Sequence, residues 1–374
     1  MMLLLFLMII FIIMLFVVLA LMKNRKKEEF DNCVPRIFQF NGTFDNYENS
    51  DQPTFPFLDV ANKYNIEIVK KFTDANLIFF SDYTLYDQNF DKIKYKEKCN
   101  YKIFAINGID LLANKKTLSE KLKGTGLVPR SYQLDDEVSI NSLVNDHYDD
   151  KLYIVKSNIQ RQEGLKITRD IDYIINKAKS DNFVVAQELL QDPMLVNGRK
   201  INIRIYLLIV IKGNVCDWWI YHDGFMYYAP EFFVKGDESP QVNITSGFID
   251  RKVYAENPLT LQDLYQFIGN RKATLLQKNI EKLFSKVRSK YKDDFVALNK
   301  STPGIKFCLY GCDVAPNENL DVLLIEVNKG PSINGRDKRD AQLKYNLIKD
   351  ALGCVHIISG DTVNPDNFIQ IKNY

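Results

Sequence analysis

Residues that bind zinc are scarce in this sequence. Among its 374 residues there are three histidines, and the six cysteines form no Cys-X-X-Cys pair and no cluster beside a histidine. A structural zinc site needs four such ligands at close spacing, so no zinc site is expected. Isolated cysteines of this kind are typical of reduced, mostly buried thiols in a reducing compartment.

The sequence also lacks an excess of charge of either sign. Lysine and arginine number 49 and aspartate and glutamate 47, which gives a formal net charge of +2. Bulk binding of nucleic acid depends on a strongly basic surface, so no nucleic-acid partner is expected. Hydrophobic residues make up 46% and charged residues 26% of the chain, as in a folded protein with one large core or two to three small ones.

One long apolar run stands at the N-terminus. Residues 1–22 contain no charge, and Lys23, Arg25, Lys26 and Lys27 follow. A transmembrane helix needs about 20 apolar residues, whereas a cleaved signal peptide would have a basic start and a small-residue cleavage site. The basic cluster after the run favours a cytosolic body. We therefore predict a single-pass membrane anchor over residues 1–22, a basic and polar linker over 23–35, and a folded body that faces the cytosol.

Short apolar segments alternate with helical ones in the first third of the body. Residues 35–40, 65–70 and 75–82 have the composition of strands. Their alternation with helical stretches predicts an N-terminal α/β domain over residues 36–126. Further along, residues 259–291 and 338–352 are amphipathic and are expected to form helices that pack on a sheet.

A hairpin is predicted over residues 304–332. Two apolar strands flank a polar turn at residues 316–321. Strand side chains alternate between faces, which predicts one face with Leu323, Ile325 and Val327 and another with Leu324, Glu326 and Asn328.

The turn also sets an expected register. If Ala315 closes against Val322, then Asp313 pairs with Leu324, and Glu326 is its diagonal neighbour at about 7–8 Å. Two carboxylates and the amide oxygen of Asn328 would suit Mg²⁺, which takes oxygen ligands at about 2 Å. From spacing alone, a half-buried hairpin with a wet acidic face is the simpler interpretation.

Basic residues occur in two other apolar strands. The segment at residues 151–156 ends in Lys156, and a buried ammonium needs a partner such as phosphate. In the segment at residues 198–206, alternation places Lys200, Asn202 and Arg204 on one face. Such a face can bind phosphates and a carboxylate, or it can be an ordinary exposed basic strand face.

The hairpin residues carry a family resemblance. The string CLYGCDVAPNENLDVLLIEVNKGPSI at residues 308–333 resembles the metal-binding end of the tubulin–tyrosine ligase family, a branch of the ATP-grasp ligases. The resemblance implies that Asp313, Glu326 and Asn328 hold Mg²⁺. Two ions are expected, and they would bridge the phosphates of ATP. It covers most of residues 102–352.

The resemblance implies a fold and further site residues. It implies an α/β (α+β) ATP-grasp fold in which a central subdomain over residues 127–185 and a C-terminal subdomain over 186–374 follow the N-terminal domain. Residues 157–167, with Gly164 as their single glycine, resemble the loop over the phosphates, and residues 183–190 resemble the strand that meets adenine. Arg204 and Lys200 are the implied catalytic residues, and the implied nucleotide-binding residues are Lys156, Gln187, Glu188, Leu189, Lys200, Asn202, Arg204 and Thr245.

Several positions depart from the family pattern. Glu188 stands where the family commonly has lysine, Asn202 where it has aspartate, and Ser246 where it has asparagine. Tyr227 stands where relatives have an arginine that acts on the γ-phosphate and the acceptor carboxylate. Lys115 matches a basic helix position of the family, and we interpret it as a solvated helix lysine.

The resemblance implies an ATP- and Mg²⁺-dependent carboxylate–amine ligase. Such an enzyme would add glutamate, glycine or tyrosine to a carboxylate of a protein through an acyl phosphate, and tubulin is the candidate protein substrate. The departures at Tyr227, Glu188 and Ser246 motivate an alternative, a membrane-tethered, catalytically weak or inactive protein that binds nucleotide and serves as a scaffold. A ligase with a substrate other than tubulin is a third interpretation.

Overall fold

The computed structural model describes residues 36–40, 56–69, 75, 77–80, 102–157, 164–247, 249–300, 304–335, 337–361 and 363–372. The predicted anchor at 1–22, the linker before residue 36 and the middle of the predicted phosphate loop lie outside these residues. Within them, no helix has the length and apolar character needed to cross a membrane.

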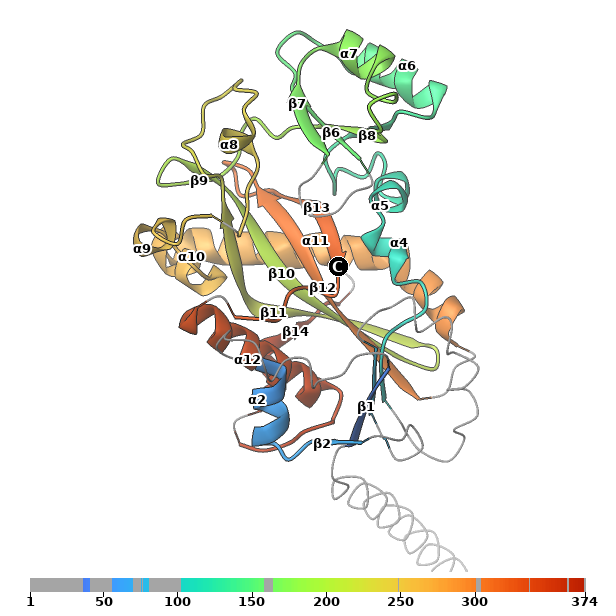
Figure 1. Cartoon of the computed structure of the whole chain (residues 1–374), viewed down its shortest axis with the longest axis vertical. Helices are drawn as coiled ribbons and strands as arrows, with labels where there is room; N and C mark the ends of the chain where they lie inside the picture. The colour runs from blue at the N-terminus through green and yellow to red at the C-terminus, as the bar shows by residue number, and fades with distance from the viewer. Residues whose placement is uncertain are drawn as a thin grey trace, which may run out of the picture.

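A large mixed sheet forms the centre of the molecule (Figure 1). Its strands follow the order β14-β11-β10-β12-β4-β3-β1-β2, with β13 paired to β12 and β9 to β10. Their bounds are β1 Arg36–Phe40, β2 Glu67–Ile68, β3 Leu77–Phe80, β4 Lys102–Phe104, β9 Leu195–Val196, β10 Arg199–Lys212, β11 Val215–Tyr228, β12 Ile305–Pro316, β13 Val322–Lys329 and β14 Phe368–Gln370.

A second sheet has four strands in the order β5-β8-β6-β7. These strands are β5 Ser131–Gln133, β6 Tyr153–Lys156, β7 Leu165–Thr168 and β8 Val185–Glu188. Two helices, α6 Glu137–Asp146 and α7 Ile171–Asn176, accompany this sheet at the top of Figure 1. The strands of the small sheet lie within residues 131–188, whereas the central subdomain was predicted over residues 127–185.

Helices cover both faces of the large sheet. The predicted helical regions appear as α10 Leu261–Ile268, α11 Asn270–Asn299 and α12 Lys338–Cys354. Residues of α11 pack on one face, and residues of α12 and of α2 pack on the other. The remaining helices are α2 Pro56–Lys63, α4 Asp110–Ala113, α5 Lys115–Lys121, α8 Pro240–Asn243, α9 Val253–Glu256 and the 3₁₀ helix η3 Pro365–Asn367.

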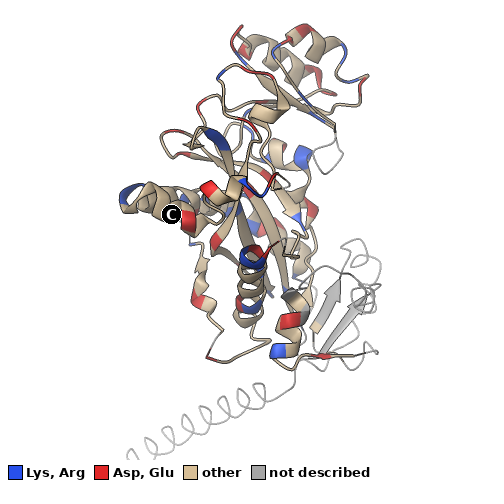
Figure 2. Ribbon diagram, turned by 60° about the vertical axis from the view of Figure 1, so that its left-hand side comes forward, with Lys and Arg blue, Asp and Glu red and all other residues tan. Residues whose placement is uncertain are grey.

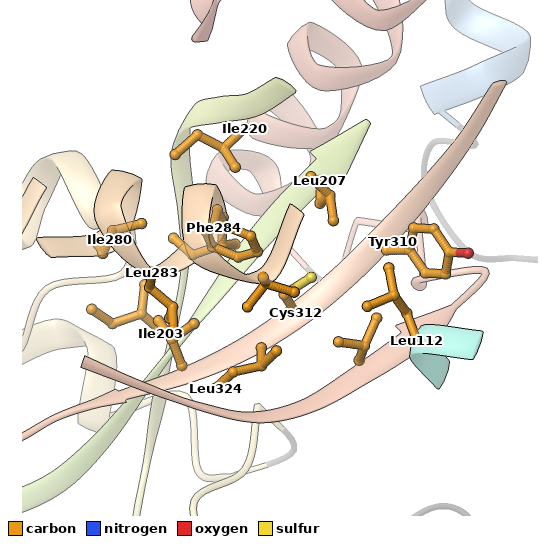
Figure 3. Close-up of a cluster of buried hydrophobic side chains, with 14 of the residues drawn as sticks. Leu112, Ile203, Leu207, Ile220, Ile280, Leu283, Phe284, Tyr310, Cys312 and Leu324 are labelled. Carbon is orange, nitrogen blue, oxygen red and sulfur yellow. The ribbon is translucent and has the colours of Figure 1, made fainter. Parts of the chain in front are cut away.

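The main core lies between the large sheet and α11. Strand alternation puts every second residue of β10, from Ile201 to Ile211, into this core. Figure 3 shows Ile280, Leu283 and Phe284 of α11 close to Ile203 of β10. The prediction that Lys200, Asn202 and Arg204 share the opposite face from these isoleucines is confirmed.

Local chemistry sets several helix boundaries. The side chain of Asn114 accepts hydrogen bonds from two N–H groups at the start of α5, and Asp337 does the same for α12. Thr260 and Asp263 form a reciprocal capping box on α10. Gly269 separates α10 from α11 with φ = 79°, a conformation that glycine adopts without strain.

The N-terminal and C-terminal strands belong to the same sheet. β4 pairs in parallel with β12, so that Lys102 lies opposite Ile305 and Phe104 opposite Phe307. The large sheet therefore runs through both the predicted N-terminal domain and the predicted C-terminal subdomain, and the domain limits inferred from the sequence stay predictions.

Gly224 is expected to be essential for stability. A Cβ atom at this position of β11 would lie 2.3 Å from the carbonyl oxygen of Arg204, which the sheet holds in place. We predict that Gly224→Ala lowers the free energy of unfolding by about 3 kcal/mol, as measured by urea denaturation. Gly213 has φ = 57° and no atom near its Cβ direction, so Gly213→Ala should cost only about 1 kcal/mol of strain. Equal losses in the two variants would contradict this account.

Candidate active site

A β-bulge determines how the two candidate metal-binding carboxylates meet. Pro316 pairs with Val322 and Val314 with Leu324, after which the register shifts and Asp313 lies directly opposite Glu326. The predicted closure of Ala315 against Val322, with Asp313 opposite Leu324, is therefore wrong. Ile325 is the extra residue on β13, and its insertion brings Glu326 beside Asp313 in place of the expected diagonal position.

The same bulge changes which side chains share a face. Leu324 and Val327 both belong to the core behind the sheet, although a regular strand would place them on opposite faces. The predicted sets Leu323–Ile325–Val327 and Leu324–Glu326–Asn328 are therefore wrong in part. Glu326 and Asn328 do share the site face, where the side-chain amide of Asn328 donates a hydrogen bond of 2.9 Å to Glu326.

The two carboxyl groups have different protonation preferences. Burial raises the pKa of Asp313 to about 7, although the positive charge of Arg204 opposes this effect. For Glu326, burial alone would raise the pKa, but the hydrogen bond from Asn328 and the charge of Lys156 outweigh it and lower the pKa. Burial and the neighbouring carboxylate of Glu326 therefore favour the protonated form of Asp313, whereas the guanidinium of Arg204 favours its charged form.

Arg204 of β10 holds Asp313 through two hydrogen bonds. Its Nε and Nη2 atoms lie 2.5 and 3.1 Å from the two carboxylate oxygens. The guanidinium stacks 4.9 Å above the ring centre of Tyr227. Gly311 makes this arrangement possible, because a Cβ atom there would lie 2.8 Å from Nη1 of Arg204. Tyr227, which replaces the arginine of the family pattern, is thus a direct neighbour of the candidate catalytic arginine.

Lys200 and Asn202 lie on the same face of β10. The ammonium of Lys200 donates to the carbonyl of Leu190 at 3.3 Å, which joins the large sheet to the segment after β8. Lys200 is buried, and burial lowers its pKa to about 8. Asn202 lies opposite Tyr227 in the β10–β11 pair.

Lys156 and Gln187 come from the small sheet and face the large one. The ammonium of Lys156 donates a hydrogen bond of 2.6 Å to Oε1 of Gln187, whose amide nitrogen donates to Ser131 at 2.9 Å. Burial lowers the pKa of Lys156 to about 8, although the carboxylate of Glu326 acts in the opposite direction. The predicted phosphate lysine is thus already within electrostatic range of a predicted metal ligand.

A pocket brings these groups together between α5, the small sheet and β13. Three of the predicted site residues, Lys156, Gln187 and Glu326, line it. Ile325, the bulge residue, also lines it, with Lys115, Leu118, Ser119, Val128, Ser131, Val185 and other residues. Arg204 and Asp313 adjoin the pocket through the direct pairing of Asp313 with Glu326.

Eight of the eleven predicted site residues are not part of this pocket lining. Five of them, Lys200, Asn202, Arg204, Asp313 and Asn328, are described above, and the other three are Glu188, Leu189 and Thr245. Glu188 forms an ion pair of 2.6 Å with Lys151 and accepts a hydrogen bond from Tyr132. Its carboxylate therefore lies on the face of β8 opposite to that of Gln187. The N–H of Leu189 donates to the carbonyl of Leu152. Thr245 is buried next to Ser246, whose backbone pairs with the end of β11 at Tyr228.

Three residues of the site were missed or misjudged from the sequence. Gly311, which leaves space for Arg204, could have been found from the sequence, because a glycine inside a strand often marks a position where another group approaches the backbone closely. Ser131, the partner of Gln187, could not, since its position depends on the β5–β8 pairing. Lys115 lines the pocket and is half-buried, whereas a solvated lysine was expected.

The donor set at the bulge fits a hard cation. Among the described residues there is no group of three or more histidine, cysteine, aspartate and glutamate side chains that could hold a metal. The site instead offers the carboxylates of Asp313 and Glu326 and the amide of Asn328. Oxygen donors of this kind suit Mg²⁺, which usually binds one or two carboxylates and leaves room for phosphate oxygens.

A pocket with buried lysines beside a carboxylate pair is the kind of site that binds a phosphorylated ligand with a divalent cation. Comparison of the sequence with models of protein families leads to the same class of site. A sequence model described as the tubulin-tyrosine ligase family matches residues 60–364. The chain belongs to this family.

Individual relatives are similar over parts of the chain. The probable tubulin polyglutamylase TTLL9 of Rattus norvegicus is 28% identical over 200 residues, 51% of this chain and 42% of the relative. The probable tubulin polyglutamylase ttll-9 of Caenorhabditis elegans is 23% identical over 297 residues, 72% of this chain and 70% of the relative. Tubulin glycylase 3B of Drosophila melanogaster is 22% identical over 57% of this chain and 30% of the relative. The chain thus spans less than half the length of the rat protein.

Lys200 is expected to reduce stability in the absence of a ligand. Its buried ammonium has a single hydrogen bond in the part of the chain that the structure describes. We predict that Lys200→Met raises the free energy of unfolding at pH 7 by about 1–3 kcal/mol. Because the folded-state pKa is lowered, the penalty is complete below about pH 8 and disappears as the pH approaches the unfolded value of 10.5.

Urea denaturation between pH 7 and pH 10 measures this effect. The stability difference between Lys200→Met and the wild type should narrow from about pH 8 upward. Lys212→Met, at the exposed end of the same strand, is the matched control and should change little. A Lys200→Met variant that is less stable than the wild type at every pH would show that the ammonium stabilises the fold.

Proposed function

We propose that this chain is an ATP- and Mg²⁺-dependent ligase of the ATP-grasp type that joins an amino acid to a protein carboxylate. Membership of the tubulin-tyrosine ligase family supports the reaction class. The observation that carries the proposal is the convergence of Lys156, Gln187 and Glu326 on one pocket, with Arg204 and Asp313 adjoining it.

The nucleotide would lie between the small sheet and β13. Gln187 can accept from and donate to an adenine edge, and Lys156 beside it supplies a positive charge for phosphate. The ammonium of Lys156 is buried, and burial of a charged group is unfavourable unless an anion pairs with it. A bound phosphate would provide that pair.

Mg²⁺ would be held by oxygen atoms of Asp313, Glu326 and Asn328. The metal neutralises charge on the phosphates that it binds. Arg204 fixes the carboxylate of Asp313 in one orientation through two hydrogen bonds. Its role toward the metal is therefore that of a positioning group, and its Nη1 donors are free of that carboxylate.

The proposed reaction has two steps. An oxygen of the acceptor carboxylate takes the γ-phosphoryl group of ATP, and ADP leaves. The amine of the incoming amino acid then attacks the acyl carbon, loses a proton and displaces phosphate, which leaves an amide. Arg204 and Lys200 are proposed to bind the phosphoryl oxygens as negative charge moves during transfer.

Glutamate is the first donor to test, and tubulin is the first acceptor. Two of the relatives compared above are named probable tubulin polyglutamylases and one a tubulin glycylase. Glycine and tyrosine are the next donors to test. We also propose that the apolar run at residues 1–22 anchors the enzyme in a membrane, with the pocket on the cytosolic side, where ATP is abundant.

A second candidate function is nucleotide binding without ligation. The observation that favours it is the stack of Arg204 on Tyr227, because the family pattern has an arginine at that position. A site with one cation fewer would bind Mg²⁺ and nucleotide but stabilise the transferring phosphoryl group less.

Replacement of the metal-binding glutamate tests the proposal. We predict that Glu326→Gln lowers ATP-dependent ligation by more than about 100-fold, because a neutral amide holds a divalent cation weakly. The measurement is incorporation of labelled glutamate, glycine or tyrosine into tubulin by the purified full chain with Mg²⁺ and ATP. Glu256→Gln, an exposed substitution on α9, is the control and should keep wild-type turnover.

The outcomes separate the candidates. Ligation retained by Glu326→Gln, with unchanged thermal unfolding, would remove this residue from the metal site. Mg²⁺-dependent ATP binding by the wild type without turnover on tubulin or total cell protein would favour the second candidate. Turnover on cell protein but not on tubulin would point to another acceptor.

A further inference from the structure

Positive charge is concentrated on one helix. The 30 residues of α11 contain eight lysine and arginine residues and three acidic ones, a net charge of +5 in a chain whose total is +2. The rest of the sequence is therefore net acidic. In Figure 2, both signs of charge appear along the described ribbon outside this helix.

Four of these lysines form a stripe along the helix. Lys278, Lys282, Lys286 and Lys290 recur every fourth residue, and all are exposed. None of them forms an ion pair with another residue of the described ranges. Like charges four residues apart lie on one face of a helix and destabilise it. The lysine stripe, as we call these four residues, therefore opposes the stability of α11.

The opposite side of α11 explains how the helix tolerates the stripe. Leu276, Ile280, Leu283, Phe284 and Val287 are buried in the main core. Packing therefore fixes the helix and aims the stripe away from the sheet. The stripe extends over about 18 Å at 1.5 Å per residue, and it is inclined to the helix axis because residues four apart advance by slightly more than one turn.

The lysine stripe and the Arg204–Asp313 pair are on opposite sides of the large sheet, whereas the pocket is lined in part by Leu118 and Val327 of the core that contains α11. The isoleucines of β10 face α11, whereas Lys200 and Arg204 alternate to the other face with Asp313 and Glu326. A partner bound to the stripe would leave the Arg204–Asp313 pair uncovered. This placement argues against the stripe as a holder of the reacting acceptor group.

The chemistry of the stripe favours a diffuse anionic surface. Lysine is a hydrated point charge, whereas arginine is the residue suited to bidentate recognition of a single carboxylate or phosphate. Clusters of four or more basic residues on an amphipathic helix bind anionic lipids. The sequence itself contains a 22-residue apolar run followed by a basic cluster, so a bilayer is the partner most consistent with both features.

We infer that the lysine stripe of α11 docks on the anionic headgroup surface of a membrane. This surface is independent of the proposed ligase function. Attraction would act over about one Debye length, about 8–10 Å at physiological salt. The occupant is an acidic lipid surface, and a soluble acidic peptide is the alternative that the experiment must exclude.

Lysine footprinting of the full chain tests the inference. The chain is mixed with vesicles of phosphatidylcholine alone or with about one third phosphatidylserine, and the rate of amine acylation at each lysine is measured by mass spectrometry. Phosphatidylserine should slow acylation of the four stripe lysines about fivefold or more, and salt at about 0.3 M should abolish the effect. Lys123 and Lys212, exposed elsewhere, should not respond.

A matched pair of variants completes the experiment. In Lys282→Gln/Lys286→Gln, protection of Lys278 and Lys290 by phosphatidylserine should fall at least about twofold, whereas Lys123→Gln/Lys212→Gln should leave it unchanged. Equal acylation rates in the two lipids would overturn the inference. Stronger protection by soluble polyglutamate than by phosphatidylserine, at equal anionic charge, would also overturn it and assign the stripe to an acidic protein. None of these results depends on ligase activity.

Discussion

The pairing of Arg204 with Asp313 is the interaction on which the site depends. Both side chains are largely buried on the sheet, where an unpaired charge would be costly. Because the two residues lie opposite each other on β10 and β12, their contact ties the register of the central strands to the geometry of the site. Glu326 then joins through the bulge on β13, and Lys156 reaches the same place from the second sheet.

This arrangement places charges of opposite sign close together in the site. Burial raises the pKa of Asp313, and the positive charge of Arg204 opposes that rise. Lys156 and Lys200 have lowered pKa values for the corresponding reason. A ligand that brings a cation to the carboxylates and anionic phosphates to the lysines would satisfy both sets at once. The groups are therefore poised for a charged ligand, at some cost to the stability of the empty protein.

The sequence could predict the site residues that follow strand periodicity. Lys200, Asn202 and Arg204 share a face because nothing interrupts β10 between them, and α12 appears where its amphipathic pattern lies. The position of Glu326 opposite Asp313 could not be predicted, since the extra residue at Ile325 has no sequence signal of its own. Glu188 was expected at the nucleotide, yet Lys151 and Tyr132 hold it on the other face of β8, and such partners are known only once strands are paired. The anchor at residues 1–22 stays a prediction.

The pairing of β12 has a consequence for how the chain can be divided. One edge of β12 is covered by β10, and the other is shared between β13 along residues 310–316 and β4 along residues 305–307. A fragment that began after residue 126 would expose the backbone of β12 at its N-terminal end, where Phe307 and Lys306 are buried. Unpaired edges of this kind recruit strands from other molecules. β4, from the first third of the chain, therefore covers an edge of the strand that carries Asp313, an edge that could otherwise pair with another molecule.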